Sequence, residues 1–245
     1  MKRTAIVGAV LAGVLFSNAD AWSGRPGDWR VFNHNGRNSR ANRAEKTISP
    51  ENVGRLVPRW RVDALSAVTS TPAVVGRVVY FGDWSGSFHA RRTSDGHEIW
   101  NRRLGSAIRP SPLVAGDRVY VPESNGVLHA LRRDTGDVVW AAPLDTQPLL
   151  SIDSSPVLAG RTIVIGVASF EQGIKKADYT FRGSVVGLDA RSGQNDGVST
   201  RPRMTRPPGP ASPSGLRLPS TRRASSSSSA PGRRTSSRRA RAVIP

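Results

Sequence analysis

Short runs of β-branched and aromatic residues alternate with polar turns along the middle of the chain. Such runs cover residues 78–81, 127–131 and 138–140. Val, Tyr, Phe and Trp favour strands. The turn at 134–137 contains Gly136, and a glycine can adopt the positive φ of a tight turn. We therefore predict an all-β fold built from many short strands.

These strands belong to a repeat with a period of forty residues. Trp60, Trp100 and Trp140 are spaced forty residues apart. The positions that recur between the first and second units are Pro72/Pro112, Gly76/Gly116, Tyr80/Tyr120, Gly86/Gly126, His89/His129, Ala90/Ala130 and Gly96/Gly136. Four short strands in about forty residues are typical of one β-propeller blade. An ordinary β-sandwich rarely shows so regular a period, and the Gly-His and Trp-Asp landmarks of WD repeats are missing.

A third unit begins at Ser155 and is interrupted by an insertion near Glu171–Arg182. It resumes at Gly183–Gly193. We therefore assign residues 60–194 to propeller repeats, enough for about three blades, and residues 22–59 to a lead-in segment.

The first 21 residues have the pattern of a cleaved export signal. Lys2 and Arg3 precede the apolar run 5–16, and Ala19-Asp20-Ala21 supplies a small-x-small cleavage site. The alternative is a transmembrane anchor, but this run spans only about 18 Å as a helix, short of the roughly 30 Å hydrocarbon core. No later segment is apolar enough to span a membrane. We expect a periplasmic or secreted protein.

The amino-acid composition excludes several kinds of functional site. The chain contains no cysteine, which excludes disulfides, thiolate zinc sites and thiol nucleophiles. A net charge of +18 would suggest a polyanionic partner, but the charge is unevenly distributed. Residues 195–245 hold 11 arginines and one acid, a charge of +10, which leaves +8 on residues 1–194.

Residues 195–245 have no aromatic residue and no hydrophobic period, so we predict a disordered tail. An Arg/Ser tail could bind nucleic acid through counterion release, or the segment could be a surface linker or anchor. The third explanation is a shifted reading frame near residue 194. The break falls inside the third unit, after Gly193, whereas natural linkers join complete domains. We favour the shifted frame and expect no nucleic-acid partner.

The repeat unit resembles a known family. Gly126, Ala130-Leu131, Thr135-Gly136 and Trp140 resemble the tryptophan-docking motif of quinoprotein propellers, which use pyrroloquinoline quinone (PQQ). The lead-in from Asn38 to Trp60 narrows the resemblance to PQQ-dependent alcohol dehydrogenases, of the polyvinyl-alcohol dehydrogenase type. The stretch 166–173 also resembles these alcohol dehydrogenases.

This resemblance covers residues 29–194. Because those relatives close with about eight blades, it implies an incomplete quinoprotein-type β-propeller of about three.

The resemblance also implies a cofactor site. Family enzymes bind PQQ on the propeller axis with a divalent cation, usually Ca²⁺, which prefers oxygen ligands. By this resemblance Glu171 is a metal ligand and Arg109 points at the quinone, and Ser154 and Ser155 bond a PQQ carboxylate. The alternatives from the residues alone are a solvated loop acid, a surface arginine and hydroxyls that cap a strand entry.

Some family features are absent. Thr69 stands where many relatives have a Glu, and the family's adjacent cysteines are missing. The catalytic Asp, the metal-binding Asn and the Trp platform come from later blades, so we assign no catalytic residue. His89 and His129 occupy equivalent repeat positions, which favours structural strand residues over metal ligands.

The function implied by the resemblance is periplasmic alcohol oxidation, with hydride passing from a hydroxyl carbon to the quinone. The intact enzyme would take an alcohol or polyol substrate and a cytochrome c acceptor. For this chain, a fragment with half of the axial wall missing, we predict weak or no PQQ binding and no turnover. The alternative is a non-catalytic PQQ-like propeller scaffold for protein–protein interaction in the cell envelope. A lipoprotein scaffold would need a cysteine at its cleavage site.

Overall fold

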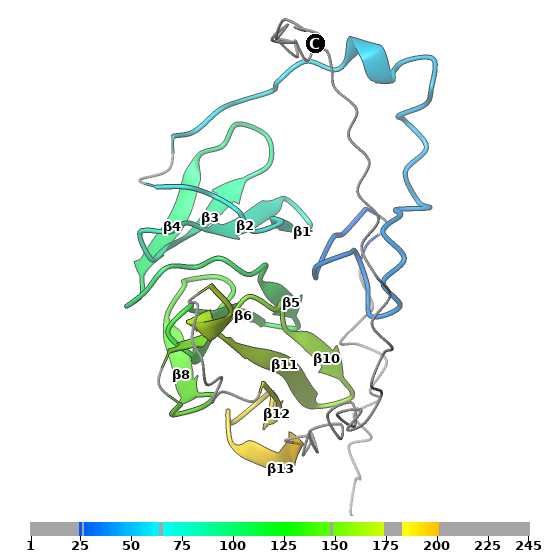
Figure 1. The fold of residues 1–245 in the computed structure, drawn as a ribbon. Helices are drawn as coiled ribbons and strands as arrows, with labels where there is room; N and C mark the ends of the chain where they lie inside the picture. The colour runs from blue at the N-terminus through cyan, green and yellow to red at the C-terminus, as the bar shows by residue number, and fades with distance from the viewer. Residues whose placement is uncertain (1–24, 26, 64–65, 148, 174–182, 201–245) are drawn as a thin grey trace, which may run out of the picture. The chain divides into compact units, whose positions relative to one another are not determined.

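The structure, a computed structural model, describes residue 25 and residues 27–63, 66–147, 149–173 and 183–200. Three antiparallel sheets make up the repeat region, in agreement with the predicted all-β propeller fold (Figure 1). The predicted export signal and residues 201–245 lie outside the described part. No helix within the described residues is long and apolar enough to cross a bilayer.

Each repeat unit forms one sheet whose strands follow chain order. Blade 1 contains β1 (Ala73–Val75), β2 (Val78–Gly82), β3 (Ser87–Arg92) and β4 (Glu98–Arg103). Blade 2 contains β5 (Leu113–Ala115), β6 (Arg118–Pro122), β7 (Val127–Arg132) and β8 (Val138–Pro143). Blade 3 contains β10 (Val157–Ala159), β11 (Thr162–Ser169), β12 (Ser184–Asp189) and β13 (Asn195–Thr200), and β9 (Leu150–Ser151) pairs with the end of β11. Two 3-10 turns accompany them, η1 (Val53–Arg55) and η2 (Phe170–Gly173).

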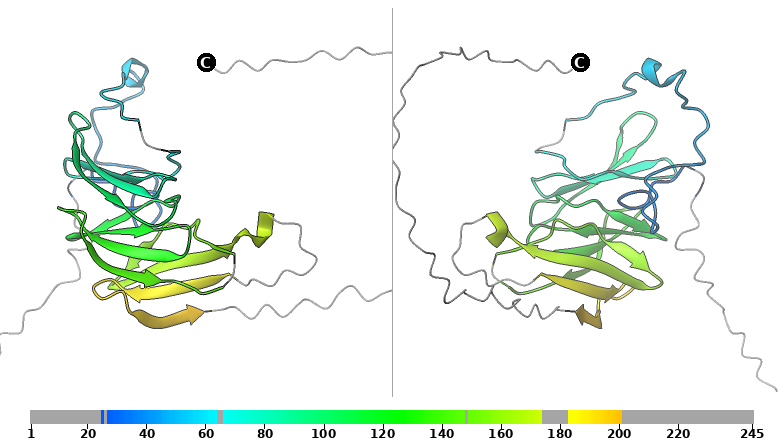
Figure 2. Two further views of the ribbon diagram at one scale, coloured as in Figure 1. Left: turned by 90° about the vertical axis from the view of Figure 1, so that its left-hand side faces the viewer. Right: turned by 45° about the vertical axis from the view of Figure 1, so that its right-hand side comes forward.

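Strand β13 differs from the expected boundary. We placed the end of the repeats at residue 194, but residues 195–200 pair with β12 and complete the third sheet (Figure 2). A strand edge offers unpaired backbone groups to any extended segment, so the strand forms although this stretch lacks the Val-Trp ending of the earlier units. The third blade thus has its fourth strand.

The core lies between successive sheets, which lie side by side (Figures 1 and 2). Tyr80 and Phe88 of blade 1 pack with Val119 of blade 2 in one buried cluster. Leu128 of blade 2 packs with Ile163 of blade 3 in the other. Alternation along the strands therefore gives blade 2 two apolar faces, one toward blade 1 and one toward blade 3.

Tryptophans fasten each blade to the next, as the spacing of forty predicts. The Trp100 indole donates to the Arg133 carbonyl at 3.1 Å, and its ring lies against Gly136 of blade 2. Gly136 has φ +74°, and a Cβ there would lie 2.5 Å from Cε3 of Trp100, so only glycine fits. Trp140 contacts Gly193 of blade 3 in the same way.

The lead-in repeats this contact at the other end. The Trp60 indole donates to the Thr93 carbonyl at 2.9 Å, and its ring covers Gly96 of blade 1. Further upstream, Trp29 forms a β-bridge with Val74, and Val31 is buried in the core cluster shared by blades 2 and 3. The lead-in is therefore attached to the blades by both backbone bonds and apolar packing.

Candidate functional site

The segments that enter the first strand of each blade place three different side chains at one repeat position. Thr69, Arg109 and Asp153 each stand three residues before the proline that opens β1, β5 and β10. The Arg109 guanidinium lies 3.4 Å from the Asp153 carboxylate. Thr69 accepts a hydrogen bond from the Trp84 indole at 2.9 Å. The contact between Arg109 and Asp153 therefore links blade 2 to blade 3, whereas Thr69 and Trp84 both belong to blade 1.

Arg109 is the centre of a cluster whose partners come from four separate segments of the chain. Its Nε donates to the Ser124 hydroxyl and a terminal nitrogen donates to the Ser151 hydroxyl, both at 2.9 Å. Its guanidinium carbon lies 4.8 Å from the ring centroid of Phe170 and 5.8 Å from that of Trp84. The Arg109 cluster is defined here as Trp84, Arg109, Ser124, Ser151, Asp153 and Phe170.

The Arg109 cluster suits a planar anion. The side chain of Arg109 remains 21% exposed, and Trp84 and Phe170 are about half exposed beside it. Two hydroxyls hold the guanidinium in one orientation, and a held fork of N–H donors binds carboxylates with directional hydrogen bonds. Two aromatic rings lie near the guanidinium and add polarisable surface to the cluster.

Ser154 and Ser155 lie near the cluster, but their hydroxyls bond backbone. Ser154 both donates to the Gly166 carbonyl at 2.7 Å and accepts from the Gly166 N–H at 2.9 Å. Ser155 accepts the Ser111 N–H of blade 2 at 3.0 Å. Ser111 accepts the Thr71 N–H of blade 1 in the same way, so this hydroxyl position joins successive blades. The structure supports the alternative of a strand-entry role.

Glu171 is buried, at 4% exposed, in η2 directly after Phe170. Its backbone N–H donates to the Ser169 hydroxyl at 3.1 Å. Across the described residues, no group of three or more acids or histidines is placed to hold a metal ion. Glu171 follows Phe170 of the Arg109 cluster directly in the chain.

Two buried acid–histidine pairs occupy equivalent places in blades 1 and 2. His89 Nε2 lies 3.4 Å from Asp83, and His129 Nε2 lies 2.6 Å from Glu123. Burial by itself would raise the pKa of Asp83, but hydrogen bonds from Ser85, His89 and the Ser87 N–H hold it below its usual value.

The repeat spacing favours a structural role for the two histidines, but it did not lead us to predict their acidic partners. An acid six residues before each histidine, repeated at a spacing of forty, was the available signal.

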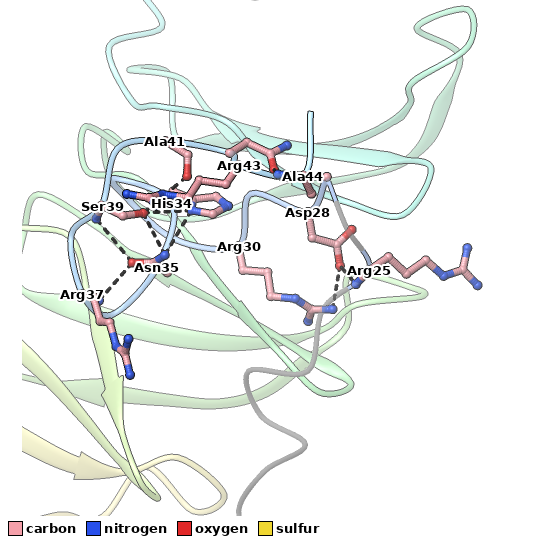
Figure 3. A pocket seen from close by; sticks show the side chains of 12 residues that line it. Arg25, Asp28, Arg30, His34, Asn35, Arg37, Ser39, Ala41, Arg43 and Ala44 are labelled. Atoms are coloured by element: carbon pink, nitrogen blue, oxygen red, sulfur yellow. Dashed lines mark hydrogen bonds and ion pairs between the residues drawn. The ribbon is translucent and has the colours of Figure 1, made fainter. Parts of the chain in front are cut away.

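A hollow in the lead-in is a separate feature (Figure 3). Four arginines line it, among them Arg25 and Arg37, and Asp28 is its one acidic lining residue. Burial alone would raise the pKa of Asp28, but N–H groups of Gly76 and Arg25 and the Arg30 guanidinium keep it low. Arg25 and Arg37 extend in different directions in Figure 3, so their charges do not converge on one ligand. None of the predicted site residues lies there.

Three sheets of four strands in chain order, joined by tryptophans that cover a glycine turn, define a β-propeller of the PQQ type. The sequence model of the family described as Outer membrane protein assembly factor BamB (PQQ_2) matches residues 52–206, more than half of the chain. The chain belongs to this family. A comparison with curated protein sequences finds no match.

Solved structures of dehydrogenases share the fold. Quinohemoprotein alcohol dehydrogenase ADHIIG from Pseudomonas putida HK5 is 26% identical with a TM-score of 0.60, over 70% of this chain and 26% of its own. The quinohemoprotein alcohol dehydrogenase from Comamonas testosteroni is 23% identical with a TM-score of 0.59, over 69% of this chain and 26% of its own. A europium-containing methanol dehydrogenase is 19% identical with a TM-score of 0.59, over 70% of this chain and 31% of its own. The chain thus spans about a quarter to a third of these enzymes' length.

Proposed function

We propose that the chain is part of a periplasmic PQQ-dependent alcohol dehydrogenase and that the Arg109 cluster is its contribution to the cofactor pocket. The observation that carries the proposal is the guanidinium of Arg109, which two serine hydroxyls hold near the rings of Phe170 and Trp84. The likeness to ADHIIG, at 26% identity, supports the same reading. Substrates of the intact enzyme would be alcohols or polyols such as polyvinyl alcohol, with a cytochrome c as electron acceptor.

The residues present fit the organic cofactor better than the cation. PQQ is a planar tricarboxylate, and Arg109 with its flanking rings offers charge, directional donors and stacking surface to such a molecule. When bound, PQQ supplies a quinone that accepts the hydride of an alcohol. Arg109 would hold a carboxylate of PQQ, while Ser124 and Ser151 orient the guanidinium. Among the described residues, no group of three or more acids or histidines offers the set of ligands that Ca²⁺ takes.

The test is a titration of the full chain with PQQ, read by quenching of tryptophan fluorescence. We expect weak, saturable binding and no alcohol-dependent reduction of an added electron acceptor. Arg109→Gln should lower the affinity at least about tenfold, because it removes a charge-assisted contact. Arg77→Gln, which changes an exposed arginine of the β1–β2 turn, is the control and should bind PQQ as the parent chain does.

A non-catalytic scaffold in the cell envelope is the second candidate, favoured by the description of the matched family as an assembly factor. The same titration separates the two. An absence of saturable PQQ binding, or equal binding by Arg109→Gln, would overturn the cofactor proposal and leave the scaffold. Localisation in the periplasm is part of both proposals and is checked by fractionation of cells that express the chain.

A further inference from the structure

We propose that Asp153 selects among the anions that the Arg109 cluster binds. It favours a ligand with a hydrogen-bond donor directly beside its carboxylate and disfavours a ligand that offers a carboxylate alone. The inference deepens the proposed function and rests on it for the place of the ligand. It starts from the way in which the N–H groups of Arg109 are shared among its partners.

One edge of the Arg109 guanidinium is taken by two serine hydroxyls. Nε donates to Ser124 and Nη2 donates to Ser151, both at 2.9 Å. Both serines are buried, so these acceptors are fixed in place. The donors of arginine form a rigid planar fork. The edge that remains for a ligand carboxylate is therefore the end of the guanidinium, formed by Nη1 and the second N–H of Nη2.

Asp153 lies beside this remaining edge. Its Oδ1 is 3.4 Å from Nη2 of Arg109, which is longer than the roughly 2.9 Å of a close charge-assisted hydrogen bond. Its Oδ2 accepts a hydrogen bond from the Ser151 hydroxyl at 2.8 Å. Ser151 therefore contacts both members of the pair. The Asp153 side chain is 56% exposed, so its carboxylate is accessible to a ligand that approaches Arg109.

A carboxylate on the end of Arg109 would meet the carboxylate of Asp153. Two like charges at this separation repel each other and lower the affinity. An ionised aspartate has only acceptor atoms. A donor beside the ligand carboxylate would therefore replace the repulsion with a hydrogen bond. Because an unfavourable contact with the wrong ligand produces specificity as well as a favourable contact with the right one does, Asp153 can discriminate between the two kinds of anion.

The acid at this repeat position is particular to blade 3. Thr69 and Arg109 occupy the equivalent positions of blades 1 and 2. The backbone contact between blades 2 and 3 is made by the neighbouring Ser155, whose hydroxyl accepts the Ser111 N–H. The blade fold therefore does not depend on the charge of Asp153. PQQ belongs to the favoured class of ligand, since one of its carboxylates lies next to its pyrrole N–H.

The test compares two ligands that differ at one ring atom: the pyrrole and furan dicarboxylates whose carboxylates flank the ring heteroatom. The pyrrole compound has an N–H between its carboxylates, and the furan compound has an oxygen there. In calorimetric titrations of the full chain, the pyrrole compound should bind at least about fivefold more tightly. A factor of this size is what one charged contact at a partly exposed site amounts to.

Asp153→Asn should reduce this preference to less than about twofold, mainly through tighter binding of the furan compound. The variant keeps a side-chain oxygen that can accept the Ser151 hydroxyl, so the cluster should keep its shape. Asp117→Asn is the matched control and should keep the preference of the parent chain. Asp117 also lies 3.4 Å from an arginine, Arg118, but where β5 turns into β6.

The ratio of the two affinities distinguishes selection from a structural role, because a distorted cluster would lose affinity for both ligands alike. No preference in the parent chain, an unchanged preference in Asp153→Asn, or binding of neither ligand would overturn the role of Asp153. The PQQ titration separates this inference from the proposed function. A preference that depends on Asp153 without PQQ binding would overturn only the cofactor proposal. Arg109-dependent PQQ binding with an unchanged preference in Asp153→Asn would overturn only the selection by Asp153.

Discussion

Blades 1 and 2 have an acid–histidine pair at the place where blade 3 buries two valines. Asp83–His89 and Glu123–His129 fill this place in the first two blades, and the strand registers put Val167 and Val186 there in the third. Both valines are at least 96% buried. The blade fold therefore does not require the polar pair.

All three blades share a second set of contacts, which join one blade to the next. Each presents a glycine turn with positive φ to an incoming tryptophan, and each has a serine or threonine whose backbone or hydroxyl joins the neighbouring blade. These contacts lie between sheets, whereas the acid–histidine pairs lie within one sheet. The comparison indicates that contacts between blades set the repeat and that positions within a blade are free to vary.

The largest expected effect comes from removing a contact that the blades share. Trp100→Ala should lower the free energy of unfolding by about 3–5 kcal/mol, because it deletes a buried aromatic ring and a hydrogen bond. Urea denaturation measures the change. Trp84→Ala, which removes a half-exposed ring, should cost less than about 1 kcal/mol. Equal losses from the two variants would contradict a special role for docking.

A second prediction concerns the acid–histidine pair of blade 2. Glu123→Val should cost about 1–3 kcal/mol, since it leaves His129 and the Ser106 N–H without their acceptor. Glu123→Val with His129→Val imitates the apolar pair of blade 3. The double variant should be more stable than the single one by about 1 kcal/mol in the same denaturation experiment. A double variant as unstable as the sum of both single variants would show that blade 2 differs from blade 3 in its packing.

A third prediction uses the tyrosines of the first two blades, which blade 3 replaces with Val164. Burial raises the pKa of Tyr80 and of Tyr120 to about 12. An unfolded tyrosine has a pKa of about 10, so both residues stabilise the fold fully below pH 10, and this contribution is lost as the pH rises through 12. Tyr120→Phe should flatten the fall of the urea midpoint between these pH values, and an unchanged fall would contradict the shift.

The smallest expected change in stability comes from a hydrogen-bond partner that His129 lacks. His89 Nδ1 lies 3.1 Å from the Asn101 amide, whereas His129 Nδ1 is buried without a hydrogen bond. Ala141 occupies the position equivalent to Asn101. Ala141→Asn should therefore raise the stability by about 0.5–1 kcal/mol. The gain should vanish when His129 is replaced by Val, and a gain that persists there would exclude this hydrogen bond as its cause.

Much of the fold could be predicted because a repeat shows the same pattern several times. The blades and their order are indicated by the spacing of Trp60, Trp100 and Trp140 and by the glycine in each turn. The end of the third blade was less predictable, because residues 195–200 pair through backbone groups that any sequence carries.

The candidate site was harder to predict than the fold. Arg109 was singled out through the resemblance, but its partners Trp84 and Ser151 come from segments far apart in the chain and share no local motif. Ser154 could equally have bonded a ligand or backbone, and the structure pairs it with Gly166. The residue types in a loop do not determine which of several nearby groups will accept their hydrogen bonds.

The sequence by itself determined the all-β class, the repeat, the identity of the docking tryptophans and the family resemblance, because periodicity and glycine positions are local properties of the chain. Only the tertiary structure decided which side chains meet across blades. It brought Arg109 near the rings of Phe170 and Trp84, paired Glu123 with His129, and left Val157 and Val185 partly exposed. These outcomes depend on how one sheet packs on the next, and packing joins residues that are far apart along the chain.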